Sequence, residues 1–397
     1  MSQPASVSSP APLLIVAGET SGDQHGAALV RALQARVPQL VVYGVGGPQM
    51  RAAGVETLCD IQALSVVGAV EILTTVPTAL RLAARLLREA QRRGTSTAVL
   101  IDAPGFNLAF ARFAKRAGLR IVYYISPQIW AWRQGRVKKV ARRVDKMLTL
   151  FPFEVPFYTA AGVDAVYVGH PVLDALQDVP GTESAAQQLG LNPQAPIVAL
   201  LPGSRRQEVQ ALLPVMLEAC QRIVAHCPQV QGVLPVAPGL DLEDMQRLLD
   251  GSVMPVRLIR GQSHVAVRAA DVAMVASGTA TLETGLLGTP MVVVYRMHPV
   301  TAWLARRLLR IPYIGLVNIV AGRPCVPELL QEALNPQTLA ALVLQYLHHP
   351  GMAAHVRQEL ARLWHIMGTA QGAQRAAACI VPFVLPAGIG SPPAECL

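Results

Sequence analysis

The stretch at residues 15–33, IVAGETSGDQHGAALVRAL, joins the end of an apolar, β-branched run to the start of a helical pattern. Glycines stand at the junction, where they permit a tight turn and a close approach of a ligand to the backbone. Glu19, Ser21 and Asp23 occupy the same junction. A strand that runs directly into a helix is half of a β-α-β unit. The stretch therefore predicts a parallel sheet with polar side chains at its carboxyl edge.

The same rhythm continues along the chain, pauses in a polar stretch rich in Pro and Gly near 169–196, and restarts at 197. We therefore predict an α/β fold with two doubly wound, Rossmann-like domains facing a cleft. The expected segments are a disordered tail at 1–12, an N-terminal domain at 13–175, a C-terminal domain at 190–360, a terminal helical segment at 361–385 that packs back on the N-terminal domain or on a partner, and a disordered tail at 386–397.

The composition limits the choice of partners. The 397 residues are 52% hydrophobic, which is enough for more than one core, and carry a net charge of +9. That charge favours anionic partners such as phosphates, nucleic acid or an anionic membrane surface. No uninterrupted apolar run is long enough to cross a bilayer. None of the six cysteines forms a C-x-x-C pair, and no histidine spacing indicates zinc, so no metal site is expected.

The segment 97–105, TAVLIDAPG, places Asp102 directly after a predicted strand. A carboxylate is costly in a core but useful at a sheet edge, where it can take a proton from an attacking hydroxyl. The alternative is an Asp that accepts backbone N–H groups in the turn at Pro104. We favour the catalytic interpretation for Asp102, and also for Glu19, which lies before a helix at the strand edge. Ser21 is explained equally well as a helix cap.

The segment 201–209, LPGSRRQEV, predicts a helix that begins after a capping box formed by Ser204 and Gln207. Arg205 and Arg206 then fall in the first helical turn, where cations oppose the helix dipole by roughly 0.3–1 kcal/mol each. A bound anion removes that conflict, and a helix N-terminus is a natural site for a diphosphate. We therefore predict an anion site at Gly203, Ser204 and Arg205, and assign Arg206 to the surface.

The segment 276–283, ASGTATLE, repeats this arrangement at the end of another predicted strand. Ser277 and Thr279 open a helix, and Glu283 lies one turn later on the same face. A carboxylate at that position can accept two hydrogen bonds from a ribose diol. The alternative is a solvated helix Glu, and the pattern alone favours neither.

Two further segments combine apolar and basic residues. The first, 124–140, YISPQIWAWRQGRVKKV, has the tryptophans and cations of a nucleic-acid surface, but no standard nucleic-acid motif accompanies them, so no nucleic-acid partner is expected. The second, 64–93, begins apolar and ends basic. Most of it is explained as a buried helix followed by an amphipathic one. Its apolar start at Val66–Leu73 also fits a membrane-facing patch with a basic fringe.

Nine motifs in order, among them VAGETSGDQHGA, IDAPGFN, FPFE, LLPGSRRQEV and SGTATLE, make the chain closely resemble the lipid-A-disaccharide synthases from about residue 13 to 378. The resemblance implies a B-type glycosyltransferase fold. It implies an inverting reaction of UDP-2,3-diacylglucosamine with 2,3-diacylglucosamine 1-phosphate, which gives a β(1→6) disaccharide and UDP. It further implies no metal or other cofactor, a cytoplasmic enzyme peripheral on the inner membrane of Gram-negative bacteria, and is compatible with a homodimer.

The resemblance also assigns roles to individual residues. Asp102 and Arg205 match the family's essential acid and arginine. The remaining matches are Glu283 and Asn318 at the UDP site, and Glu19, Ser21 and Asp23 in the first-domain loop. The chain departs from the family at Gly105, where a second Asp is usual, and at AGRP (321–324), where the usual pattern resembles ADRE.

Together these observations predict that Asp102 is the general base, with Glu19 or Asp23 as the next candidates. Arg205 and the helix after Gly203 are expected to stabilise the departing diphosphate. Ser204, Ser277 and Thr279 are expected to contact the nucleotide. Two alternatives stay open: a UDP-sugar 2-epimerase of the same fold, and a non-enzymatic carrier of lipid or nucleotide.

Overall fold

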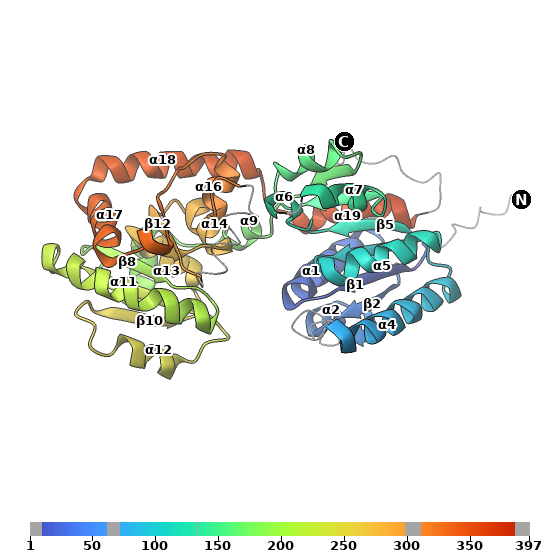
Figure 1. The fold of residues 1–397 in the computed structure, drawn as a ribbon, viewed down its shortest axis with the longest axis horizontal. Coiled ribbons are helices and arrows are strands. Elements are labelled where there is room, and N and C mark those ends of the chain that lie inside the picture. Colours follow the sequence, from blue (N-terminus) through green and yellow to red (C-terminus); the bar gives the residue numbers. More distant parts are fainter. Residues whose placement is uncertain (1–9, 62–71, 133, 298–310, 386–397) are drawn as a thin grey trace, which may run out of the picture. The chain divides into compact units, whose positions relative to one another are not determined.

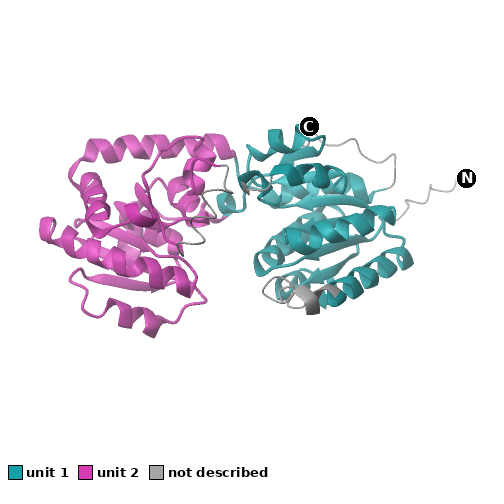
Figure 2. Cartoon of the chain, viewed as in Figure 1, with its two compact units in different colours: residues 1–174, 369–397 teal, residues 175–368 magenta. Residues whose placement is uncertain are grey.

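The computed structural model of the chain describes residues 10–61, 72–132, 134–297 and 311–385 (Figure 1). The chain divides into two compact units (Figure 2). Unit 1 comprises residues 1–174 and 369–397, and unit 2 comprises residues 175–368. Each unit is built on one parallel sheet, so the prediction of two doubly wound α/β domains is confirmed.

The sheet of unit 1 has seven strands in the order β3-β2-β1-β4-β5-β6-β7. The strands are β1 (Leu13–Ala17), β2 (Val42–Gly46), β3 (Glu56–Asp60), β4 (Thr97–Ile101), β5 (Arg120–Tyr124), β6 (Lys146–Thr149) and β7 (Asp164–Tyr167). The helices are α1 (Thr20–Arg36), α2 (Pro48–Ala52), α4 (Ile72–Arg92), α5 (Pro104–Arg116), α6 (Ile129–Trp132), α7 (Val137–Ala141), α8 (Glu154–Thr159), α9 (Val172–Ala175) and α19 (Gly372–Val384). The strand order reverses direction between β1 and β4, which is where doubly wound sheets bind ligands.

The sheet of unit 2 has six strands in the order β10-β9-β8-β11-β12-β13. The strands are β8 (Ile197–Leu201), β9 (Gln231–Val236), β10 (Val256–Arg260), β11 (Val272–Ala276), β12 (Met291–Tyr295) and β13 (Glu328–Leu330). The helices are α10 (Thr182–Gln188), α11 (Arg206–His226), α12 (Leu242–Leu249), α13 (Ser263–Ala269), α14 (Thr279–Leu286), α16 (Leu316–Ala321), α17 (Pro336–His348) and α18 (Pro350–Met367). Here the order reverses between β8 and β11.

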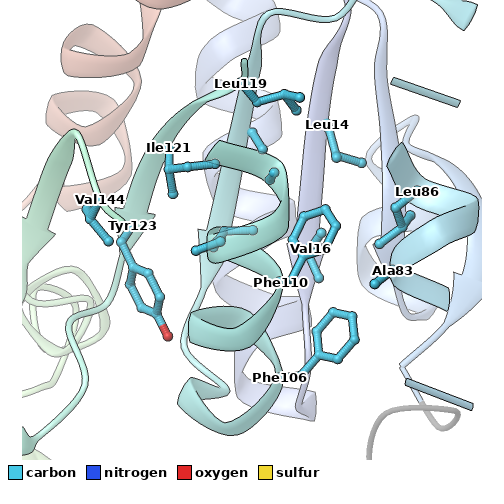
Figure 3. Packing of buried hydrophobic residues seen from close by; sticks show 14 of the residues in the cluster. Leu14, Val16, Ala83, Leu86, Phe106, Phe110, Leu119, Ile121, Tyr123 and Val144 are labelled. Carbon is cyan, nitrogen blue, oxygen red and sulfur yellow. The ribbon is translucent and has the colours of Figure 1, made fainter. Parts of the chain in front are cut away.

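The central strands β1, β4 and β11 are apolar except for Thr97 at the start of β4, because helices cover both faces of a parallel sheet. All five residues of β1, of β4 and of β11 are buried. In unit 1, α5 packs Phe106 and Phe110, one turn apart, with ring centroids 5.9 Å apart (Figure 3). They belong to one apolar cluster with Val16 of β1 and Leu86 of α4. This packing fixes the start of α5, and with it the turn that follows β4.

The C-terminal segment is divided between the two units. Residues 361–367 complete α18 in unit 2, whereas α19 belongs to unit 1, so the segment expected at 361–385 is not one element. The Phe383 carbonyl of α19 accepts hydrogen bonds from Thr97 Oγ1 at 2.8 Å and from Arg120 Nη2 at 2.6 Å. The Ala11 N–H donates to the Val384 carbonyl at 3.0 Å. Residues 10–12, expected in the disordered tail, are therefore ordered against α19.

Candidate active site

A cavity of about 420 Å³ lies at the carboxyl ends of β8, β9, β10 and β11 in unit 2. It brings together six residues that the sequence analysis singled out: Gly203, Ser204, Arg205, Ser277, Thr279 and Glu283. The first three follow β8 and the others follow β11, so the cavity lies at the point where the strand order reverses. A ligand is expected at such a point in a doubly wound sheet.

The turn between β8 and α11 differs in detail from the prediction. Arg205 is the N-cap residue and α11 begins at Arg206, so the expected capping box of Ser204 and Gln207 is wrong. Glu208 supplies the contact instead, because its carboxylate reaches back to two backbone donors. Its Oε2 accepts the Ser204 N–H at 3.1 Å and the Arg205 N–H at 3.3 Å. This arrangement also requires Gly203, whose φ is 113° and where a Cβ would lie 2.5 Å from Glu208 Oε2.

Arg205 is held loosely in this structure. Its Nη1 donates to Glu208 Oε1 at 2.8 Å, while 80% of the side chain is exposed. An ion pair that exposed contributes at most about 1 kcal/mol, so the guanidinium can move to another anion at little cost. Arg206 is exposed and lies outside the cavity lining, as expected.

The turn between β11 and α14 supplies hydroxyl groups and a carboxylate. Ser277 Oγ donates to the Ile314 carbonyl at 2.8 Å, and Thr279 is the first residue of α14. Glu283 Oε2 lies 3.4 Å from His264 Nε2. His264 lies in α13, shortly after the end of β10, and was not among the residues predicted from the sequence.

Asn318 is placed away from the cavity surface. It is fully buried in α16, and all of its amide atoms are used inside the protein. Its Nδ2 donates to the Val326 carbonyl and to Glu328 Oε1, each at 2.9 Å, and its Oδ1 accepts the Val326 N–H at 3.1 Å. The side chain has no exposed surface for a direct contact with UDP, so in this structure it holds the loop before β13.

In unit 1, Asp102 directly follows β4 and has an unusual backbone conformation. Asp102 and Ala103 have φ values of 48° and 43°, which lie in the left-handed region that residues other than glycine rarely adopt. Such residues cost on the order of 1–3 kcal/mol each and concentrate at functional sites. The Asp102 carbonyl accepts hydrogen bonds from Tyr123 Oη at 2.5 Å and from Asn107 Nδ2 at 2.9 Å. These bonds hold the strained turn in place.

The carboxyl group of Asp102 lies in an environment that disfavours its charge. Burial raises its pKa above the ordinary value, and the nearby negative charge of Glu19 raises it further. Glu19 is exposed as the N-cap residue of α1. Gly18 allows the two turns to approach, because a Cβ at that position would overlap the Cβ of Ala103. The turns after β1 and β4 thus bring two predicted acids together at the reversal point of unit 1.

Asp23 is wrong as a candidate base. It is only 2% exposed, and its carboxylate accepts three backbone N–H groups at the start of α2. Oδ1 accepts from Gly47 at 2.7 Å and from Met50 at 3.0 Å, and Oδ2 accepts from Gln49 at 2.9 Å. A carboxylate that accepts three backbone N–H groups at a helix N-terminus serves as a cap. Ser21, by contrast, is exposed in the first turn of α1.

Within the part of the chain that the structure describes, no group of three His, Cys, Asp or Glu side chains is arranged to hold a metal ion. Among the same residues, no helix combines the length and the apolar character needed to cross a membrane.

The comparison with protein families decides the relationship. A model of lipid-A-disaccharide synthetase matches residues 13–380, which is most of the chain. The chain belongs to the lipid-A-disaccharide synthetase family. The lipid-A-disaccharide synthase of Syntrophus aciditrophicus (strain SB) is 44% identical over 366 residues, covering 92% of this chain and 96% of that protein. The predicted family and the prediction of a glycosyltransferase enzyme are therefore confirmed.

Solved structures with the same fold belong to more than one class of enzyme. The glycotransferase of kitacinnamycin superposes with a TM-score of 0.58 at 17% identity, covering 94% of this chain and 99% of that one. A UDP-N-acetylglucosamine 2-epimerase has the same TM-score at 15% identity, covering 92% and 94%. Likeness at this identity shows the fold alone. The epimerase alternative therefore gains no support over the family match.

Proposed function

We propose that this chain joins UDP-2,3-diacylglucosamine to 2,3-diacylglucosamine 1-phosphate, forming a β(1→6) disaccharide 1-phosphate and releasing UDP. Family membership supports this reaction. The structural observation that carries it is the cavity of unit 2, where Arg205, Ser277, Thr279 and Glu283 line one space beside a helix N-terminus. Unit 2 is then the UDP-sugar domain, and unit 1 is the acceptor and lipid domain.

The donor diphosphate is proposed to bind where α11 begins. The first N–H groups of a helix have no intrahelical partner, and its N-terminus carries partial positive charge, so this end attracts a diphosphate. Arg205 exchanges Glu208 for the phosphate oxygens, which is a small cost because its present ion pair is exposed. The cation and the helix end together stabilise the charge that develops on the leaving UDP. The proposal needs no cofactor.

The nucleoside is proposed to lie against α14 and β9. The Glu283 carboxylate accepts hydrogen bonds from the ribose diol, and His264 at 3.4 Å orients it. Pro235, Ala237 and Pro238 supply apolar surface to the same cavity. With the nucleoside bound there, the sugar ring of the donor is proposed to lie toward the diphosphate end of the cavity, where the glycosidic bond forms.

Asp102 is proposed as the general base. Its raised pKa makes the carboxylate a stronger proton acceptor than an ordinary Asp. The acceptor 6-hydroxyl gives its proton to Asp102, its oxygen forms a bond to the anomeric carbon, and the bond from that carbon to the diphosphate breaks. UDP departs with the bonding electrons, and attack on the face opposite UDP inverts the anomeric centre. Glu19 is proposed to act indirectly, because its negative charge raises the pKa of Asp102.

Both substrates carry acyl chains, so the enzyme is proposed to work as a peripheral protein on the cytoplasmic face of the inner membrane. The apolar run predicted to face lipid, Val66–Leu73, lies outside the residues whose side chains the structure describes. Beyond it on α4, Leu80 is 51% exposed, and the exposed arginines include Arg81, Arg85 and Arg88. These side chains are suited to an interfacial helix.

Arg93, the last residue of the segment 64–93 whose basic end we expected to face lipid headgroups, contributes to stability instead. Its guanidinium bonds to Glu56 at 2.6 Å and to Glu89 at 3.1 Å, and it lies 4.4 Å from the Tyr43 ring centroid. The Glu56 contact is the largest cause of the raised pKa of Arg93. Glu56 lies on β3, Tyr43 on β2 and Glu89 on α4, so the Arg93 guanidinium joins three elements of unit 1.

A UDP-release assay with the two lipid sugars in detergent micelles tests the reaction. Release that requires both sugars, with formation of the disaccharide, supports the proposal. Release from the donor alone, or conversion of the donor to its 2-epimer, would assign the chain to the epimerase class. Tight binding without turnover would assign it to the carriers. Asp102→Asn serves as the inactive control, since it keeps the cavity of unit 2 intact.

A further inference from the structure

A second cavity, again of about 420 Å³, is lined entirely by cations. Its lining consists of Arg112, Lys115, Arg116, Lys139, Arg142 and Arg143. The first three lie on the last turns of α5, and the others lie on or just after α7. We call this set the basic pocket. None of its members takes part in the reaction described above.

The basic pocket is remote from the proposed base. Asp102 precedes the first turn of α5, whereas Lys115 and Arg116 lie in the last turn. At 1.5 Å of rise per residue, the twelve steps from Pro104 to Arg116 separate the two ends of α5 by roughly 18 Å. The pocket therefore lies toward the amino edge of the unit 1 sheet, and Asp102 lies at the carboxyl edge.

The charges of the basic pocket are only partly compensated. Lys115 forms an ion pair with Asp145, whose other oxygen accepts the Ile121 N–H at 2.8 Å. Arg143 Nη1 donates to the Leu108 carbonyl at 2.8 Å. Burial lowers the pKa of Arg143, and the positive charge of Arg112 lowers it further. Among the described residues, one carboxylate pairs with these six cations, which leaves a concentration of positive charge that an anion would relieve.

Helix dipoles explain a part of this cluster. Lys115 and Arg116 stand at the C-terminus of α5, where cations are favourable without any ligand. That explanation does not extend to Arg112, one turn earlier, or to Arg142 and Arg143, which follow a helix of only five residues. Bringing these cations to the mouth of one cavity costs repulsion, and a phosphate group with several acceptor oxygens fits such a site.

The surroundings favour a phosphate carried by a lipid. Phe113, in the same turn as Arg112, is 38% exposed. Helix α4 does not line the pocket, but it packs against α5 (Figure 1) and carries exposed Leu80, Arg81 and Arg85. Exposed apolar side chains among cations are the pattern of a surface that meets anionic headgroups.

We propose that the basic pocket binds the phosphate headgroup of an anionic lipid and so anchors unit 1 to the membrane surface. The inference rests on the proposed function, because that function brings the enzyme to a lipid surface. It adds a binding site for a lipid that is neither donor nor acceptor.

The test variant is Arg112→Gln, Lys139→Gln and Arg142→Gln together, which spares Lys115 and Arg143 because both hold protein groups. The control is Arg31→Gln, Arg36→Gln and Arg222→Gln, which removes the same charge from exposed helix positions elsewhere. Sedimentation with vesicles of phosphatidylcholine, with and without phosphatidylglycerol, measures binding. Because each basic residue near an anionic surface contributes about fivefold, the test variant should lose roughly 100-fold in affinity. The control should lose no more than a few-fold.

Equal loss in the two variants would overturn the site, since bulk charge would then explain binding. Strong binding of inorganic phosphate to the wild type, lost in the test variant while vesicle binding persists, would overturn the lipid assignment. UDP release from both lipid sugars in detergent micelles separates this proposal from the proposed function. We expect the test variant to retain that activity. A wild type that binds anionic vesicles through the basic pocket but forms no disaccharide would refute the proposed glycosyltransferase function and still support the lipid-binding site.

Discussion

The reversal points of the two sheets have the same topology and opposite chemistry. In unit 1, the turns after β1 and β4 present Glu19 and Asp102, and burial with like charge raises the pKa of Asp102. In unit 2, the turns after β8 and β11 present Arg205 and hydroxyl groups beside the start of α11. The doubly wound fold thus determines where a ligand binds. In the function that we propose, the few side chains after each strand decide whether that place accepts a proton or stabilises an anion.

The strongest test of this contrast is Asp102→Asn. Asn tolerates the left-handed backbone, so the turn should survive. Losing a positioned base typically costs 10²–10⁴-fold, so kcat should fall by about that factor. UDP affinity, measured by calorimetry, should stay within about twofold because we propose that unit 2 holds the nucleotide. Normal turnover would show that Asp102 is only a turn residue.

Arg205→Ala should reduce kcat/KM by about 10²–10³-fold, since it removes a preorganised charge from the leaving diphosphate. UDP should also bind more weakly, in contrast to Asp102→Asn. The exposed neighbour Arg206→Ala is the matched control and should change both quantities by less than about threefold. Thermal melting should be nearly unchanged in both variants, because the Arg205 side chain is 80% exposed. Near-normal UDP release by Arg205→Ala would contradict the anion site.

Gly105→Asp, which restores the acid usual in the family, should change turnover by only a few-fold. The position is exposed, and a Cβ there meets no atom within 4 Å, so the fold accommodates it. The added charge would raise the pKa of Asp102 slightly further. A large gain in turnover would show that a single acid at this turn is insufficient for the reaction.

Glu19→Gln tests the coupling between the two acids through a pH profile. The base must be deprotonated, so activity falls as the pH drops through the pKa of Asp102. Because the Glu19 charge raises that pKa, its removal should move the acidic limb of kcat/KM to lower pH by a fraction of a unit. An unchanged limb, with Asp102→Asn inactive, would mean that burial alone sets the pKa.

Several features followed from the sequence alone. The alternation of β-branched runs and helical patterns predicted two doubly wound units, and ordered motifs identified the family. The polar residues after β1, β4, β8 and β11 were also predictable, because side chains that interrupt a buried run mark the strand ends. Each of these signals is local, and local periodicity is what a single sequence displays.

Only the tertiary structure showed which polar side chains are used for hydrogen bonds inside the protein and which stay free to meet a ligand. Asp23 has the sequence context of Glu19, yet the backbone at 47–50 folds over it and uses its carboxylate. The Asn318 amide donates hydrogen bonds to Val326 and Glu328. The Arg93 guanidinium donates to Glu56, which lies on β3, 37 residues away in the sequence. The basic pocket needs α5 and α7 side by side. Partners for a polar group come from segments distant in the chain, so its burial and hydrogen bonds are decided only when the units fold.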